Sequence, residues 1–128
     1  MNPVKAVYLL PLTKPIVIGD LTHEGSVFTA CQKLVQGYVE IVYLTENDHE
    51  GWHLAAYVNE DGIGQGFSLN RQLCGYHLFG PVVIVRERID REGETHYADV
   101  TEEDWQWIRK NDNMVIDVAA LVNALSGN

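Results

Sequence analysis

The alternation of apolar and polar positions predicts a domain that mixes strands and helices. Val4–Leu10 and Ile16–Ile18 are short, β-prone apolar runs separated by a proline-containing turn, so we expect two strands there. After Ser26 the period changes, because apolar residues recur every three or four positions, as on one face of a helix. Ser26 is the expected N-cap of this helix and Gly37 its expected stop.

The middle of the chain returns to strands. Tyr38–Leu44 and Leu54–Val58 are β-prone runs separated by the polar loop TENDHEG, and a turn at residues 59–62 follows the second run. The segment SLNRQLCGYHLFG has no clear alternation, and we interpret it as one or two helical turns that begin near Ser68.

A hairpin and two helices are expected in the last third. Val82–Ile89 is the clearest strand of the chain, and the turn DREG joins it to a partner strand in ETHYADV. Thr101 precedes three acidic residues, a pattern that favours the start of a helix. Asp112 or Asn113 is the expected cap of a final amphipathic helix.

These elements indicate the α+β class, with a mostly antiparallel sheet and helices packed on one side. The length of 128 residues fits a single domain that is large enough to bury a core. We expect residues 1–100 to form the α+β core and residues 101–128 to form a C-terminal helical extension that packs on the same domain.

Charge narrows the class of partner. The chain has 9 Lys and Arg against 18 Asp and Glu, a formal net charge of −9, so broad binding to nucleic acid is not expected. The acidity is consistent with solubility alone, or with imitation of a polyanion such as DNA. Acidic residues are interspersed, which weakens the DNA-mimic interpretation without excluding it.

The sequence indicates a cytoplasmic protein. It shows no signal-peptide pattern and no run of about 18 apolar residues that would cross a membrane. Cys31 and Cys74 lie among apolar neighbours, so we expect two buried, reduced thiols rather than a disulfide.

One motif suggests zinc chemistry. His49-Glu50-Gly51-Trp52-His53 matches the H-E-x-x-H pattern, in which two histidines on one helix face bind Zn²⁺ and the glutamate acts as a base. A glycine inside the motif and a strand-like sequence after it instead favour a hairpin loop with two exposed histidines. A metal-dependent hydrolase that uses His49, His53 and Glu50 is therefore the alternative function, and no metal or cofactor is expected in the preferred one.

The arginines suggest an anion site. Arg86 and Arg88 alternate with Glu87 and should share one face of their strand, close to Arg91 in the following turn. Arginine forms bidentate contacts with phosphate and carboxylate groups. Pairing with acidic residues across the hairpin would explain the same pattern without any ligand.

Further candidates lie in expected loops, where polar residues held by a rigid sheet often bind ligands. Asn59 begins the turn NEDG, and Asn70 and Arg71 lie in the segment after the glycine-rich stretch. Turn chemistry alone would also account for the two asparagines. The candidate ligand-binding residues are thus Asn59, Asn70, Arg71, Arg86 and Arg88.

Several stretches resemble a family of small uncharacterised proteins of phages and plasmids, which is catalogued only as a domain of unknown function. The resemblance rests on GYVEIV, YVNEDG, LNR and GPVVI, and covers roughly the first 90 residues. It implies an accessory protein of a mobile element that acts in a bacterial cytoplasm.

The expected function is non-enzymatic binding that inhibits or sequesters a host component, for example one that serves in defence. The expected partner is a host protein or a small anionic ligand such as a nucleotide signal. Neither bulk nucleic acid nor a membrane is expected as a partner, and association of the chain with itself stays open.

Overall fold

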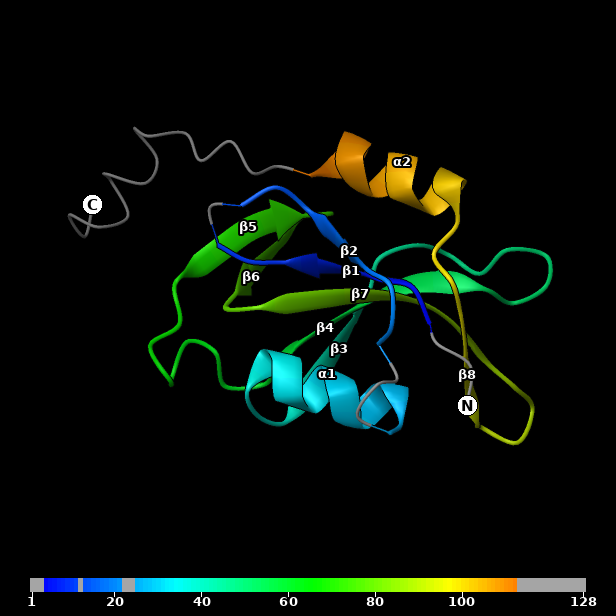
Figure 1. The fold of residues 1–128 in the computed structure, drawn as a ribbon, viewed down its shortest axis with the longest axis horizontal. Coiled ribbons are helices and arrows are strands. Elements are labelled where there is room, and N and C mark those ends of the chain that lie inside the picture. The colour runs from blue at the N-terminus through cyan, green and yellow to red at the C-terminus, as the bar shows by residue number, and fades with distance from the viewer. Residues whose placement is uncertain (1–3, 12, 22–24, 113–128) are drawn as a thin grey trace.

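The computed structural model describes residues 4–11, 13–21 and 25–112, and its centre is one antiparallel sheet (Figure 1). The strands and helices are β1 (Ala6–Leu9), β2 (Ile16–Ile18), α1 (Val27–Val35), β3 (Val39–Tyr43), β4 (His53–Asn59), β5 (Leu69–Leu73), β6 (Tyr76–Phe79), β7 (Val82–Ile89), β8 (Thr95–Ala98) and α2 (Glu102–Asn111). The α+β class and the mostly antiparallel sheet are confirmed.

Strand β7 organises this sheet. The order is β2-β1-β7-β4-β3, and β8 also pairs with β7. β1 pairs with the first half of β7, at Val82–Ile84, while β8 pairs with its second half, from Arg86 to Ile89. The other edge of β7 is paired with β4, so the long strand connects nearly all parts of the sheet.

The expectation that the helices pack on one side of the sheet is wrong. Figure 1 shows α1 and α2 on opposite sides of it. α1 covers a core that includes Ala55, Tyr57 and Val83, whereas Ile108 of α2 belongs to a second core that includes Ala56 and Ile84. Residues 82–85 are apolar at every position and buried on both faces, and a sheet of this kind needs a cover on each side.

The segment after Ser68 is a β-hairpin and not the expected helical turns. β5 and β6 pair antiparallel and are joined by Cys74 and Gly75, which have positive φ values of 51° and 82°. Two consecutive residues in this conformation form the tight turn that suits a hairpin. The turn also exposes Cys74, whereas Cys31 is buried as expected.

Both helices begin at the N-cap residues expected from the sequence. The Ser26 side chain accepts a hydrogen bond from the backbone N–H of Thr29, and Thr101 and Asp104 form a capping box at α2. The left-handed residue that ends α1 is Gln36, one position before the expected glycine. The final helix expected from Asp112 or Asn113 lies almost wholly outside the described residues.

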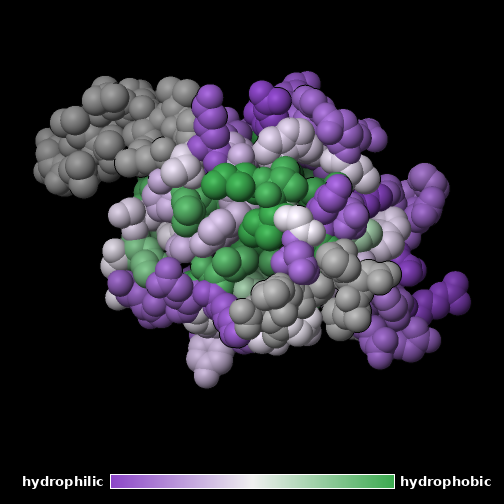
Figure 2. Space-filling view, viewed as in Figure 1, coloured by the Kyte–Doolittle hydropathy of each residue, from purple (hydrophilic) through white to green (hydrophobic). Residues whose placement is uncertain are grey.

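The surface between the helices is partly apolar. Figure 2 shows apolar side chains gathered around the region of β1 and β2, with hydrophilic residues around them. Ile16 and Val17 of β2 are 51% and 45% exposed. None of the described helices has the length and apolar character to cross a membrane.

Candidate ligand-binding site

Asn59 has a structural position at the end of α1. Its Nδ2 donates to the backbone carbonyls of Val35 and Gln36 at 3.0 and 3.3 Å, and its Oδ1 accepts from the backbone N–H of Asp61 at 2.8 Å. The side chain is 4% exposed. It therefore satisfies carbonyls that a helix end leaves without partners.

Asn70 and Arg71 are also buried, at 0% and 1% exposure. Asn70 donates to the carbonyls of Leu9 and Gly80 and accepts from Nε of Arg71 at 2.7 Å. The remaining nitrogens of Arg71 donate to Asp112 and to the carbonyls of Leu10 and Thr13. These contacts connect the β5–β6 hairpin to the turn after β1 and to the end of α2. The Asn70 amide and the Arg71 guanidinium thus spend their hydrogen bonds within the fold and not on a ligand.

Arg86 and Arg88 do lie together, on the α2 face of β7, beside Trp52. Their guanidinium carbons are 5.5 and 5.2 Å from the centroid of the Trp52 ring, within the range of a cation–π contact. Gly51, at φ +91°, precedes the tryptophan, and a Cβ atom there would come within 3.3 Å of the Arg88 stem. The glycine thus lets the loop approach the arginine closely.

The two arginines differ in their partners. Arg86 donates to Asp48 at 3.2 Å and to Asp104 at 3.4 Å. Arg88 forms no hydrogen bond or ion pair with any side chain that the structure describes, and its Nε is buried without a partner. The sequence suggested that acidic residues across the hairpin would pair with the arginines. Arg86 instead pairs with a carboxylate from a loop and with another from α2.

Asp48 shapes the loop that carries Trp52. Its Oδ1 accepts from the backbone N–H groups of Glu50 and Trp52, and its Oδ2 accepts from Arg86. Although desolvation opposes it, these N–H groups and the Arg86 charge lower the pKa of the Asp48 carboxyl below its ordinary value. The carboxylate is thus well suited to hold the loop against β7.

The H-E-x-x-H segment is not a helix, so its histidines do not share a helix face. His49 is exposed and lies 3.3 Å from Glu50 in a turn, whereas His53 begins β4 and is 5% exposed. The expectation of two exposed histidines is thus correct for His49 and wrong for His53. His53 Nε2 lies 2.8 Å from Glu87 Oε2, away from the other members of the motif.

His53 belongs to a buried polar network on the α1 face. Glu87 is 1% exposed and hydrogen-bonds to the Tyr57 hydroxyl through Oε1 and to His53 through Oε2. The hydroxyl oxygens of Tyr57 and Tyr97 are 3.0 Å apart. Burial, then the hydrogen bond to Glu87, raises the pKa of Tyr57. Burial together with the Glu87 charge raises the pKa of nearby Cys31 to about 12.

Sequence reasoning missed this network because its members are far apart in the chain. Tyr57 is 30 positions from Glu87 and 40 from Tyr97, and His53 is 34 positions from Glu87. A signal was present, since Glu87 alternates with arginines and must face the opposite side of the sheet from them. His53 likewise alternates with Ala55 and Tyr57, two residues of the apolar face.

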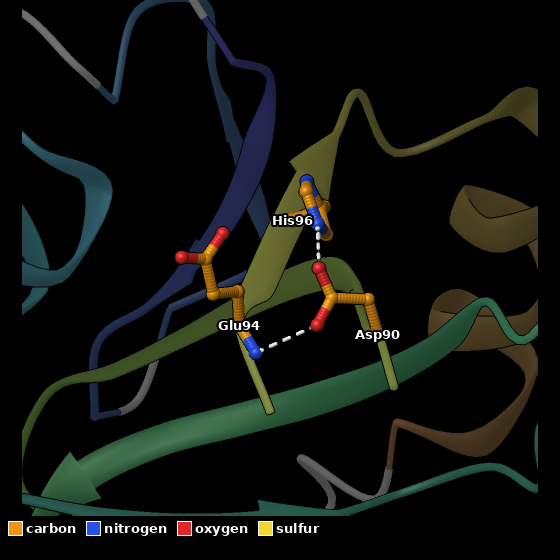
Figure 3. Close-up of side chains that lie close together, drawn as sticks. All are labelled: Asp90, Glu94 and His96. Carbon is orange, nitrogen blue, oxygen red and sulfur yellow. Dashed lines mark hydrogen bonds and ion pairs between the residues drawn. The ribbon is translucent and has the colours of Figure 1, made fainter. Parts of the chain in front are cut away.

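A third polar group lies at the tip of the β7–β8 hairpin (Figure 3). Asp90, Glu94 and His96 place one potential ligand atom each within 4.8 Å of one another, and within the described ranges no other such group of three was found. The bond from His96 at 2.7 Å and the backbone N–H groups of Glu94 and Glu92 lower the pKa of Asp90. Both oxygens of Asp90 already accept hydrogen bonds from within the hairpin. The group therefore has a structural role, which is to stabilise the turn between β7 and β8.

The chain matches one known protein family over most of its length. A model described as a domain of unknown function, DUF3846, matches residues 4–111. The chain belongs to this DUF3846 family. The match extends through α2, past the first 90 residues that carry the resemblance noted from sequence, so the DUF3846 domain includes both helices.

No curated protein and no solved structure matches the chain. The DUF3846 match carries no activity, ligand or partner in its description.

Proposed function

We propose that this DUF3846 protein is a non-enzymatic binding protein that holds a phosphate-bearing ligand at Arg88, beside Arg86 and Trp52. The observation that carries the proposal is the state of Arg88. It is a partly buried guanidinium with an aromatic ring beside it, a buried and unpartnered Nε, and no carboxylate bound to it within the described part of the chain.

The chemistry of arginine supports a phosphate ligand. A guanidinium presents its donors in a planar fork that matches the oxygens of phosphate or carboxylate. A guanidinium with no acceptor in the fold favours a ligand that supplies acceptors, and the half-buried Arg88 side chain reaches the surface where such a ligand can bind. Arg88 offers such donors, whereas the donors of Arg71 are used within the fold.

Arg86 and Trp52 would assist the binding in different ways. Arg86 is neutralised by Asp48 and Asp104, so it holds the Trp52 loop and α2 against the sheet. Trp52 presents an aromatic surface at the same place, and such a ring stacks on flat groups such as a nucleobase. A nucleotide combines the two chemistries that this surface offers.

The biological setting is part of the proposal and rests on the resemblance described from sequence. We propose an accessory protein of a phage or plasmid that works in the bacterial cytoplasm and sequesters a nucleotide signal of the host. The metal-dependent hydrolase is not proposed, because the histidines of its motif lie apart. The DNA-mimic interpretation of the negative charge stays an untested prediction.

The proposal is tested by calorimetric titration of the purified protein with ADP at low, constant ionic strength. Arg88→Ala should weaken ADP binding about tenfold or more, because a charge-assisted bidentate contact is lost. Arg91→Ala is the matched control, since Arg91 is an exposed arginine of the same hairpin, and it should leave the affinity within about twofold. Equal loss in both variants, or no ADP binding by the wild-type protein, would refute the proposal.

A further inference from the structure

Strand β3 is an edge of the sheet and lacks the features that usually protect edge strands. It is the last strand in the order β2-β1-β7-β4-β3, so one side of it pairs with no strand that the structure describes. Four of its five residues are apolar or aromatic, none is a proline or lysine, and its register with β4 is uninterrupted. β2, at the opposite edge, has only three residues and directly follows Pro15. Because short length, proline and lysine are what blunt an edge, β3 is the edge that stays open to another strand.

The hydrogen bonds to β4 show which backbone groups of β3 point to the open side. The Glu60 N–H donates to the Tyr38 carbonyl at 2.9 Å, and the Leu44 N–H donates to the Leu54 carbonyl at the same distance. In an antiparallel pair every second residue bonds to the partner strand, and the residues between them direct their N–H and C=O groups the other way. The residues whose backbone groups point to the open side are therefore Val39, Ile41 and Tyr43.

A cleft lies beside this strand on the α2 face of the sheet. It has a volume of about 400 Å³ and includes Glu40 and Val42, whose β4 partners belong to the core on that face. The turn after β4 adds Glu60 and Asp61, and β6 adds the exposed Tyr76. Three carboxylates thus line the cleft, and no Lys or Arg of the described ranges does. This lining suits a lysine or arginine side chain, whose stem packs on an aromatic ring while its charged head meets the carboxylates.

The α1 face of the same strand offers an apolar surface. Tyr43 pairs with Ala55, a residue of the core under α1, so its side chain lies on that face. It forms one wall of a second cleft, of about 430 Å³, together with Ile89 of β7. The two side chains are 53% and 46% exposed. An aromatic ring beside an aliphatic chain suits an apolar side chain of a partner.

We infer that the β3 edge binds an extended peptide of another protein, in which basic and apolar residues alternate, as an additional antiparallel strand. Main-chain hydrogen bonds to β3 provide affinity, and alternate side chains of the peptide enter the clefts on the two faces. The basic side chains lie on the α2 face beside Glu40, and the apolar ones lie on the α1 face against Tyr43. The inference uses other residues than the phosphate site at Arg88 and does not depend on it.

Charge favours this occupant over a second copy of the chain. A second copy would bring the same carboxylates to the edge, and each copy has a formal net charge of −9. Like charges on adjacent strands are destabilising, whereas opposite charges across a strand pair stabilise it. A basic peptide also approaches an acidic protein faster, because the net charges attract.

The test uses the blocked peptide acetyl-Val-Arg-Val-Arg-Val-amide, titrated into the ¹⁵N-labelled full chain at low, constant ionic strength. The peptide should bind with one-to-one stoichiometry. At saturation, amide hydrogen exchange should slow at least about fivefold at Ile41 and Tyr43, because their N–H groups gain partners. It should change less than about twofold at Glu40 and Val42, whose N–H groups already point to β4.

Two control peptides separate strand addition from attraction between net charges. Acetyl-Val-Val-Val-Arg-Arg-amide has the same composition without the alternation, and acetyl-Val-Glu-Val-Glu-Val-amide has the alternation with the opposite charge. Each should bind at least about tenfold more weakly than the test peptide. Equal binding of the rearranged peptide, or exchange that stays unchanged at Ile41 and Tyr43, would overturn the inference.

A pair of variants tests the position of the basic side chains. Glu40→Gln should weaken binding of the test peptide about two- to fivefold, because a charge pair across the strands is lost. Glu92→Gln is the matched control, since Glu92 is an exposed glutamate of the β7–β8 turn and its loss changes the net charge equally. Equal weakening in both variants would overturn the inference. A chain that is dimeric without peptide, with Ile41 and Tyr43 already protected, would also overturn it and assign the edge to a second copy.

Discussion

The two faces of β7 treat charge in different ways, although the charged residues are consecutive. On the α1 face, Glu87 is 1% exposed, and both of its oxygens receive hydrogen bonds from β4. On the α2 face, Arg86 is 20% exposed and pairs with two aspartates, while Arg88 has a buried nitrogen without a partner. The comparison shows that neighbouring partners, and not residue type, decide whether a charge stabilises the fold or stays available.

The largest effect should follow the removal of Glu87. Glu87→Ala should lower the free energy of unfolding by about 3–5 kcal/mol, because His53 and Tyr57 would both lose their buried hydrogen-bond partner. Urea denaturation at pH 7 measures this change. Glu87→Gln keeps one acceptor oxygen and should lose less. A loss below about 1 kcal/mol for Glu87→Ala would mean that the α1 face does not depend on its charge.

An effect of intermediate size is expected at alkaline pH from Cys31. Its pKa is raised to about 12 by burial and by Glu87, so the folded state holds this proton more tightly than the unfolded state does. The contribution is fully present below pH 9 and falls as the pH rises toward 12, by about 1.4 kcal/mol per pH unit.

The free energy of unfolding, measured between pH 9 and 11, should therefore fall more steeply for the wild type than for Cys31→Ala. Tyr57 and Tyr97, whose pKa values are also raised, contribute a slope of the same sign to both proteins. Parallel curves for the two proteins would show that folding does not raise the pKa of Cys31.

The smallest effect should come from the α2 face. Arg86→Ala should cost only about 1 kcal/mol or less, since its ion pairs are partly solvated and the carboxylates of Asp48 and Asp104 still accept backbone N–H groups. Chemical denaturation of this variant beside Glu87→Ala compares the two faces directly. If Arg86→Ala were as costly as Glu87→Ala, the distinction between the faces would not hold.

Much of the fold could be predicted from local pattern. The strand at Val82–Ile89, the hairpin after it, and the N-caps Ser26 and Thr101 follow from alternation, turn residues and capping preferences. The β5–β6 hairpin could not, because LNRQL has polar residues at buried positions and its turn places the non-glycine Cys74 at positive φ.

The candidate site was predictable only in part. Alternation was sufficient to place Arg86 and Arg88 on one face of a strand. The burial of Arg71 depends on Asp112, which is 41 positions away, and the role of His53 depends on Glu87. Such pairings arise from the topology of the sheet, and a local pattern does not contain them.

Strand β4 is buried along its whole length, and a polar side chain lies at each of its ends. His53 meets Glu87 at one end, and Asn59 caps α1 at the other. If β4 shifted by one residue, both side chains would turn to the opposite face and lose these partners together. The apolar residues of β4 would fit either face of the sheet. The polar side chains at its two ends therefore select the correct strand register over a register shifted by one residue during folding.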